Sequence, residues 1–163
     1  MRHFVLTILI TVSASIGLAQ NFSKLENIPL NDSMDCKNAE PKVLECCNYL
    51  LTTPCEETLN RLKAVQFIMK WMENTSDYTF TLDKIFLSVS KSNKVLISNL
   101  FASMAKTAIT ETMNENFTFK YITIFAEYCE NPKYKVKQSA FIKKMIKAKN
   151  DNTLAEFIRE NSK

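Results

Sequence analysis

Apolar residues recur every three to four positions over most of this chain, and that spacing predicts α-helices. The pattern places seven helices at residues 41–51, 53–73, 82–90, 93–113, 117–130, 134–149 and 153–159. Asn, Asp and Ser clusters make residues 20–37 polar and aperiodic, so we expect an irregular N-terminal arm there. The expected fold class is all-α, with six to seven helices in an antiparallel bundle or array, and a single helical domain over 38–163.

Two prolines mark expected helix starts. Pro41 suits the first turn of a helix, because its missing N–H has no intrahelical acceptor there. Thr53, Pro54 and Glu56 have the spacing of a capping box, which predicts that the second helix opens at Thr53. The apolar face of that second helix is broad and is typical of a central helix. Its apolar residues are Leu59, Leu62, Val65, Ile68, Met69, Trp71 and Met72.

Asparagine stands where several helical patterns stop. The chain has one glycine, Gly17, so helix ends beyond it need another residue that tolerates the left-handed conformation, and Asn is the next best. The Asn residues at these ends are Asn74, Asn114, Asn131 and Asn150. Residues 74–81 are rich in turn formers and then alternate aromatic and polar side chains, which predicts a short extended piece without a strand partner.

The first nineteen residues have the layout of a secretory signal peptide. Arg2 and His3 give a positive start, residues 4–16 are apolar or small, and small residues precede an expected cleavage between Ala19 and Gln20. A retained N-terminal anchor is the alternative. We expect an exported protein, periplasmic or extracellular, with no transmembrane segment after cleavage.

The composition restricts the chemistry of the remaining chain. The only histidine of the full sequence is His3, within the leader, so proton transfer or metal binding by imidazole is not expected in the rest of the chain. Phosphate-binding loops depend on glycine, and the sequence has no glycine after Gly17. The formal net charge of +4 is too mild to indicate a partner. We therefore expect no cofactor, no metal site and no catalytic residue.

Five cysteines follow the leader: Cys36, Cys46, Cys47, Cys55 and Cys129. Export favours disulfides, and the odd number leaves at least one thiol free. Cys47 shares a stripe with Val43 and Leu50, whereas Cys46 lies off it. This makes Cys46 the better partner for Cys36 or Cys55, so those three are the disulfide candidates. The paired spacing of a zinc site is absent.

Two further clusters have a functional and a structural interpretation. Glu73, Asp77 and Asp83 surround the break after Trp71, and two carboxylates can hydrolyse a glycoside without histidine. Helix capping explains Asp77 and Asp83 equally well. Residues 133–149 hold seven lysines and no acid, with Lys137, Lys144 and Lys147 on one expected helix face. A basic helix attracts acidic polymers or lipids, but a solvated face of a packed helix is the simpler interpretation, and export argues against nucleic acid as partner.

Trp71, Met72, Thr75, Asp77 and Tyr78 form a Trp-Met-x-x-Thr-x-Asp-Tyr motif. Together with residues 48–80 and 125–149, this motif resembles a group of small exported all-helical bacterial proteins of unknown function. That group more often has Gly-Thr-Pro at positions 74–76 and generally lacks the cysteine cluster. The resemblance implies an exported bacterial helical domain and no particular activity.

These observations predict a non-enzymatic interaction module whose partner is an unknown protein or envelope component. We expect its contact surface at Trp71, Asp77 and Tyr78, where an aromatic-rich helix end meets a loop. The alternatives are a carrier of a small apolar ligand between aromatic helices and an acid-pair hydrolase of cell-wall polymer. Residues 117–128 are rich in aromatic side chains, which is typical of the lining of an apolar cavity and of an ordinary core alike.

Overall fold

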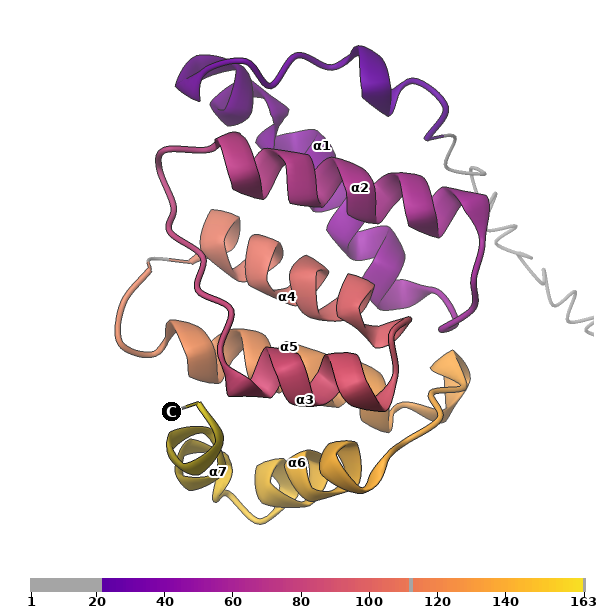
Figure 1. Ribbon diagram of the computed structural model, residues 1–163, viewed down its shortest axis with the longest axis vertical. Coiled ribbons are helices and arrows are strands. Elements are labelled where there is room, and N and C mark those ends of the chain that lie inside the picture. Colours follow the sequence, from indigo (N-terminus) through magenta and orange to yellow (C-terminus); the bar gives the residue numbers. More distant parts are fainter. Residues whose placement is uncertain (1–21, 112, 163) are drawn as a thin grey trace, which may run out of the picture.

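A computed structural model describes residues 22–111 and 113–162, and within them the fold is all-α, as predicted (Figure 1). The expected leader over 1–19 and its cleavage site lie outside the described residues. The described residues form seven α-helices and two 3₁₀ turns: η1 (Leu25–Asn27), α1 (Ser33–Thr52), α2 (Leu59–Asn74), α3 (Lys84–Ser92), α4 (Leu96–Thr110), α5 (Phe117–Glu130), η2 (Pro132–Tyr134), α6 (Ala140–Asn150) and α7 (Leu154–Asn161).

The central helix is α4 rather than α2. It packs against α1 and α2 on one side and against α3 and α5 on the other, and α6 and α7 continue the stack beyond α5 (Figure 1). The stripe of Leu96, Leu100, Met104 and Ala108, which recurs at helical spacing, is buried, as are six further residues of this helix. The sequence prediction for α2 was wrong because part of its broad apolar face is exposed to solvent instead of entering the core.

Helix α1 begins eight residues earlier than predicted. Its N-cap is Asp32, whose side chain accepts a hydrogen bond from the backbone N–H of Asp35 at 2.8 Å. Pro41 therefore lies inside the helix, where it is exposed. Burial of Cys36 and Ala39 on the face of Val43 stabilises this earlier start, so the irregular arm ends before Ser33.

The predicted capping box at Thr53 does not form. Helix α2 starts at Leu59, and its cap is Thr58, which accepts from the backbone N–H of Arg61. The hydroxyl of Thr53 instead donates to the carbonyl of Tyr49 at the end of α1. A hydrogen bond joins the loop between α1 and α2 to η2, because the Cys55 N–H donates to the carbonyl of Tyr134 at 2.9 Å.

The four asparagines named from the sequence are not left-handed, although Asn152, directly after the C-cap of α6, is. The C-caps that follow α2 and α5, Thr75 and Asn131, are extended, and Asp151 after α6 also has negative φ. The described residues with positive φ are Lys135 and Asn152. Helix α6 thus ends on a left-handed asparagine two residues beyond Asn150, with the Asn152 N–H donating to the Lys149 carbonyl at 3.2 Å and the Thr153 N–H to the Ala148 carbonyl at 2.8 Å.

Helix α6 is shorter than predicted, since it begins at Ala140 with Ser139 as its cap. Its apolar face of Ile142, Met145 and Ile146 is buried, which confirms an amphipathic helix. Lys137 precedes the helix and so does not share the face of Lys144 and Lys147. Lys147 pairs with Asp151, Lys149 with Glu130 at 2.5 Å and Lys135 with Glu56 at 3.4 Å, so three of the seven lysines over 133–149 have carboxylate partners.

Within the described parts of the chain, every helix is too short or too polar to cross a bilayer.

Candidate functional site

Trp71, the first residue of the predicted contact surface, is completely buried. It lies on α2, and its indole N–H donates to the carbonyl of Cys36 on α1 at 3.0 Å. The rings of Tyr78 and Phe80 lie 5.5 and 6.0 Å from it, measured between centroids. The expectation that Trp71 is exposed was wrong, because the segment after α2 folds back over it.

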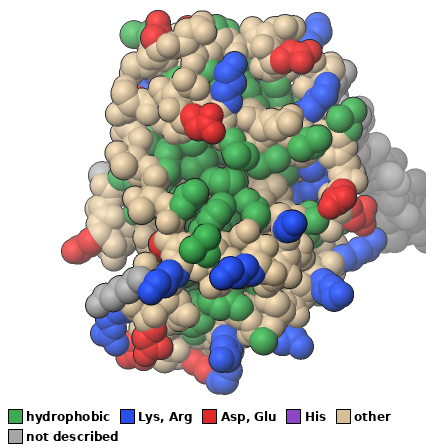
Figure 2. All heavy atoms as spheres, viewed as in Figure 1, with side chains coloured by type: hydrophobic (Ala, Val, Ile, Leu, Met, Phe, Trp, Pro, Cys, Tyr) green, Lys and Arg blue, Asp and Glu red, His purple; other side chains and the backbone are tan. Residues whose placement is uncertain are grey.

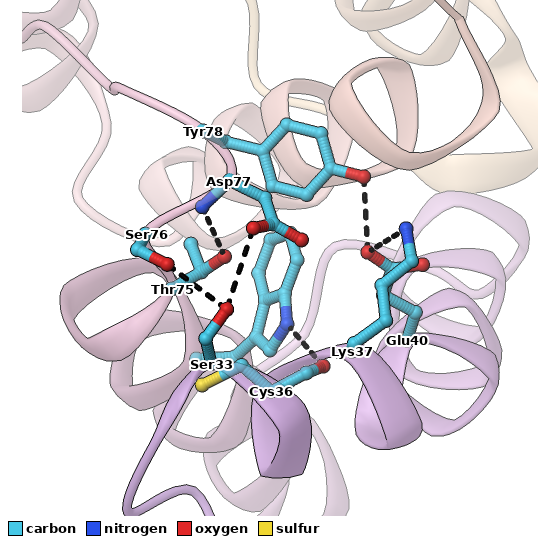
Figure 3. Close-up of polar contacts among 9 residues, drawn as sticks. Ser33, Cys36, Lys37, Glu40, Thr75, Ser76, Asp77 and Tyr78 are labelled. Carbon is cyan, nitrogen blue, oxygen red and sulfur yellow. Dashed lines mark hydrogen bonds and ion pairs between the residues drawn. The ribbon is translucent and has the colours of Figure 1, made fainter.

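Polar contacts hold that returning segment on α1. The Tyr78 hydroxyl donates to Glu40 at 2.9 Å, and Glu40 also pairs with Lys37 at 3.0 Å (Figure 3). Ser33, in the first turn of α1, donates to Asp77 at 3.4 Å and accepts from Ser76 at 3.0 Å. Trp71, Asp77 and Tyr78 thus lie close together, and their contacts fasten the 75–83 segment to α1 and α2. We call Tyr78, Asp77 and their α1 partners Glu40 and Ser33 the clamp residues.

The predicted carboxylates also have local structural roles. Asp83 caps α3 by accepting from the backbone N–H of Phe86 at 3.0 Å, as the capping interpretation requires. Asp77 is exposed and engages Ser33, and Glu73 is exposed on the last turn of α2. None of these three carboxylates lines the groove beside α2 that is described below.

All five cysteines following the leader are free thiols in this structure. Cys36 and Cys46 lie ten residues apart on α1, about 15 Å along its axis, whereas a disulfide needs Cα atoms within about 7 Å. These two candidates therefore cannot pair while α1 is folded. Cys46 is as deeply buried as Cys47, which corrects the view that Cys46 lies off the core face. A bridge that uses Cys55 remains a prediction.

Burial raises the pKa of each thiol, and it raises that of Cys46 to about 12. Cys55 is the one half-buried thiol of the five, and Arg61 and the Tyr128 hydroxyl partly oppose its shift. The thiolate is the reactive form, so we expect iodoacetamide at mildly alkaline pH to label Cys55 first and the other four after unfolding in urea. Peptide mass spectrometry measures this order. Early labelling of Cys46 or Cys47 would contradict the burial of that face of α1.

The same shifts predict loss of stability at high pH. A thiol with a pKa of 9 when unfolded and about 12 at Cys46 in the native protein loses its proton first in the unfolded state. The contribution of the thiols to the free energy of unfolding should therefore be constant below pH 9 and should fall as the pH rises from 9 toward 12. Urea titrations across this range measure it, and a Cys46→Ala variant should show a shallower fall.

A groove of about 600 Å³ lies between α2, the α1–α2 loop and the first turn of α4. Helix α2 has two apolar stripes, of which Ala64, Phe67, Ile68 and Trp71 enter the core. The second stripe faces solvent, with Leu59, Leu62 and Met69 exposed to 66, 51 and 38 %. Val65, Val95 and Ile97 complete the apolar wall. Figure 2 shows hydrophobic side chains gathered across this face between α2 and α3.

Arg61 lines the groove yet is only 4 % exposed. Its Nη1 donates to the carbonyl of Leu50 at 3.1 Å and to Thr53 Oγ1 at 2.8 Å. Its Nη2 donates to Asn99 Oδ1 at 2.8 Å and to Ser98 Oγ at 3.3 Å. The guanidinium thereby joins the carboxyl end of α1 to the amino end of α4, and a helix carboxyl end favours a cation.

The charge of Arg61 has no acidic partner among the described residues, and its Nε–H has no acceptor. Sequence reasoning gave Arg61 no role, since arginine is seldom fully buried. A signal was present, however, because Arg61 is in phase with Ala64, Ile68 and Trp71 on the core stripe of α2.

Comparison of the chain with protein-family models, curated protein sequences and solved structures gives no match. The resemblance to the exported bacterial group with the Trp-Met-x-x-Thr-x-Asp-Tyr motif therefore stays a prediction.

Proposed function

We propose that this protein is a non-enzymatic binding protein that takes a small apolar ligand in the groove between α2 and α4. The observation that carries the proposal is the solvent-facing stripe of Leu59, Leu62 and Met69 beside a hollow of about 600 Å³. Binding sites for small molecules are mostly apolar hollows of about 300–1,000 Å³ with a few polar groups, and this groove has that size and lining. The expected leader places this binding outside the cytoplasm, in a bacterial envelope or beyond it.

The proposal moves the binding surface away from the Trp71 motif. Trp71 is buried, and Tyr78 and Asp77 are engaged with α1, so these side chains serve the fold. Arg61 and Ser98 lie together in the groove wall, with 3.3 Å between Nη2 and Oγ, and Lys94 lines the groove in the turn before α4. This polar group beside the apolar stripe suits a small molecule with one polar end, and Glu56, Glu57 and Thr58 supply the other polar lining. An interaction module that receives a partner's helix is the second candidate, because Leu59 and Leu62 stand on one exposed helix face.

Nile red, a neutral dye that fluoresces in apolar surroundings, tests the proposal. We expect it to bind the wild-type protein and to bind Leu62→Asp at least tenfold more weakly, because contact with one leucine contributes about 1.5–3 kcal/mol. Leu87→Asp is the matched control, since Leu87 is 52 % exposed on α3 and does not line the groove. Dye titrations give the dissociation constants, and thermal unfolding shows that both variants fold.

Two outcomes would contradict the proposal. Equal weakening by Leu62→Asp and Leu87→Asp would place the dye elsewhere on the surface. No binding of Nile red to the wild-type protein would remove the small-ligand function, and the second candidate would then require a protein partner whose binding Leu62→Asp abolishes.

A further inference from the structure

Arg61 is a buried cation whose set of partners is incomplete. A guanidinium has five N–H donors, and four of them have acceptors that are all neutral. The fifth, Nε–H, is shielded from solvent and has no acceptor. Burying a charge without a counter-ion is costly, so an anion at this end of the groove would relieve an electrostatic cost that the protein bears when empty.

Lys94 supplies a second positive charge at the rim. It is exposed, lines the groove at the turn before α4, and has no acidic partner among the described residues. Two acids, Glu56 and Glu57, also line the groove, but Glu56 already lies 3.4 Å from the ammonium of Lys135. Glu57 has no basic partner in an ion pair of the described residues, so the unpaired charges of the lining are this one acid and the two cations Arg61 and Lys94, which favours an anion over a cation.

We propose, on the basis of the binding function above, that the ligand is an amphiphile with an ionised carboxylate at one end. Its carboxylate is held by Arg61 and Lys94, and its hydrocarbon chain lies along Leu62, Val65 and Met69. The head group replaces Ser98 Oγ, the most distant of the four acceptors at 3.3 Å, and accepts from Nε–H as well. Arginine binds carboxylates through two parallel N–H donors of this kind.

The test compares three ligands with the same twelve-carbon chain: dodecanoate, methyl dodecanoate and dodecanol. We expect dodecanoate to bind the wild-type protein at least tenfold more tightly than either neutral analogue, as measured by displacement of Nile red. Lys94→Gln should weaken dodecanoate about threefold and leave the neutral analogues unchanged. Lys91→Gln is the matched control, because Lys91 is exposed and unpaired by any described acid but lies outside the groove.

The role of Arg61 is tested without replacing it, since a variant could fail to fold. In a ¹H–¹⁵N spectrum, the Arg61 Nε–H signal should shift on addition of dodecanoate and stay in place with dodecanol. Arg159 on α7 is the internal control, and its signal should not move.

The outcomes separate this inference from the binding function. Equal affinity for all three ligands, or an unmoved Arg61 signal with dodecanoate bound, would overturn carboxylate recognition. Either result would still be consistent with binding of an apolar ligand in the groove. If neither Nile red nor any of the three ligands binds the wild-type protein, both proposals fail together.

Discussion

Replacing Arg61 with alanine should reduce the free energy of unfolding by about 2–4 kcal/mol, because a buried acceptor that loses its donor costs about 1–3 kcal/mol. The substitution removes four hydrogen bonds that join the end of α1, the start of α2 and the start of α4. It leaves Asn99 Oδ1 buried without its charged donor, while the Leu50 carbonyl keeps only the amide of Asn99. Urea unfolding followed by circular dichroism measures the loss.

Two companion variants test the reason for this loss. Arg61→Lys keeps the charge but cannot reach acceptors on both sides, so it should still lose about 1.5–3 kcal/mol, the contribution of a hydrogen bond to a charged group. Lys70→Ala, at an exposed position of the same helix, should stay within about 0.5 kcal/mol of wild type. Near-native stability of Arg61→Ala would show that the three-helix junction holds without the guanidinium.

Replacing Trp71 with alanine should cost about 3–5 kcal/mol, because the indole is fully buried between α1 and α2. Trp71→Phe retains much of the packing and loses the hydrogen bond to the Cys36 carbonyl, so its expected cost is smaller, about 1–3 kcal/mol. Trp71 is also the only tryptophan of the chain, so the Trp71→Ala series is followed by circular dichroism rather than fluorescence.

The clamp residues around Trp71 provide the comparison. Tyr78→Phe removes one partly exposed hydrogen bond to Glu40 and should cost about 0.5–1.5 kcal/mol. Asp77→Asn, at an exposed contact, should cost less. A Trp71→Ala protein with wild-type stability would contradict the burial of the indole and would restore the idea of a contact surface at this motif.

The burial of Trp71 is the feature of the motif that the sequence did not predict. The spacing of Trp71, Asp77 and Tyr78 correctly joined a helix end to a loop, and the structure brings these residues together. It could not tell whether the loop leaves the indole open or folds back over it. That outcome depends on Glu40 and Ser33, which lie more than thirty residues away in the chain.

The sequence by itself determined the all-α fold, the stripes that α4 and α6 bury, and the cap at Asp83, because these depend on residues within a few turns of one another. Only the tertiary structure decided where α1 and α2 begin, which helix is central, and which of the two apolar stripes of α2 remains exposed. The local sequence of a helix with a broad apolar face is compatible with burial of either stripe. The choice follows from how α1 and α4 pack against α2, with Arg61 held between them.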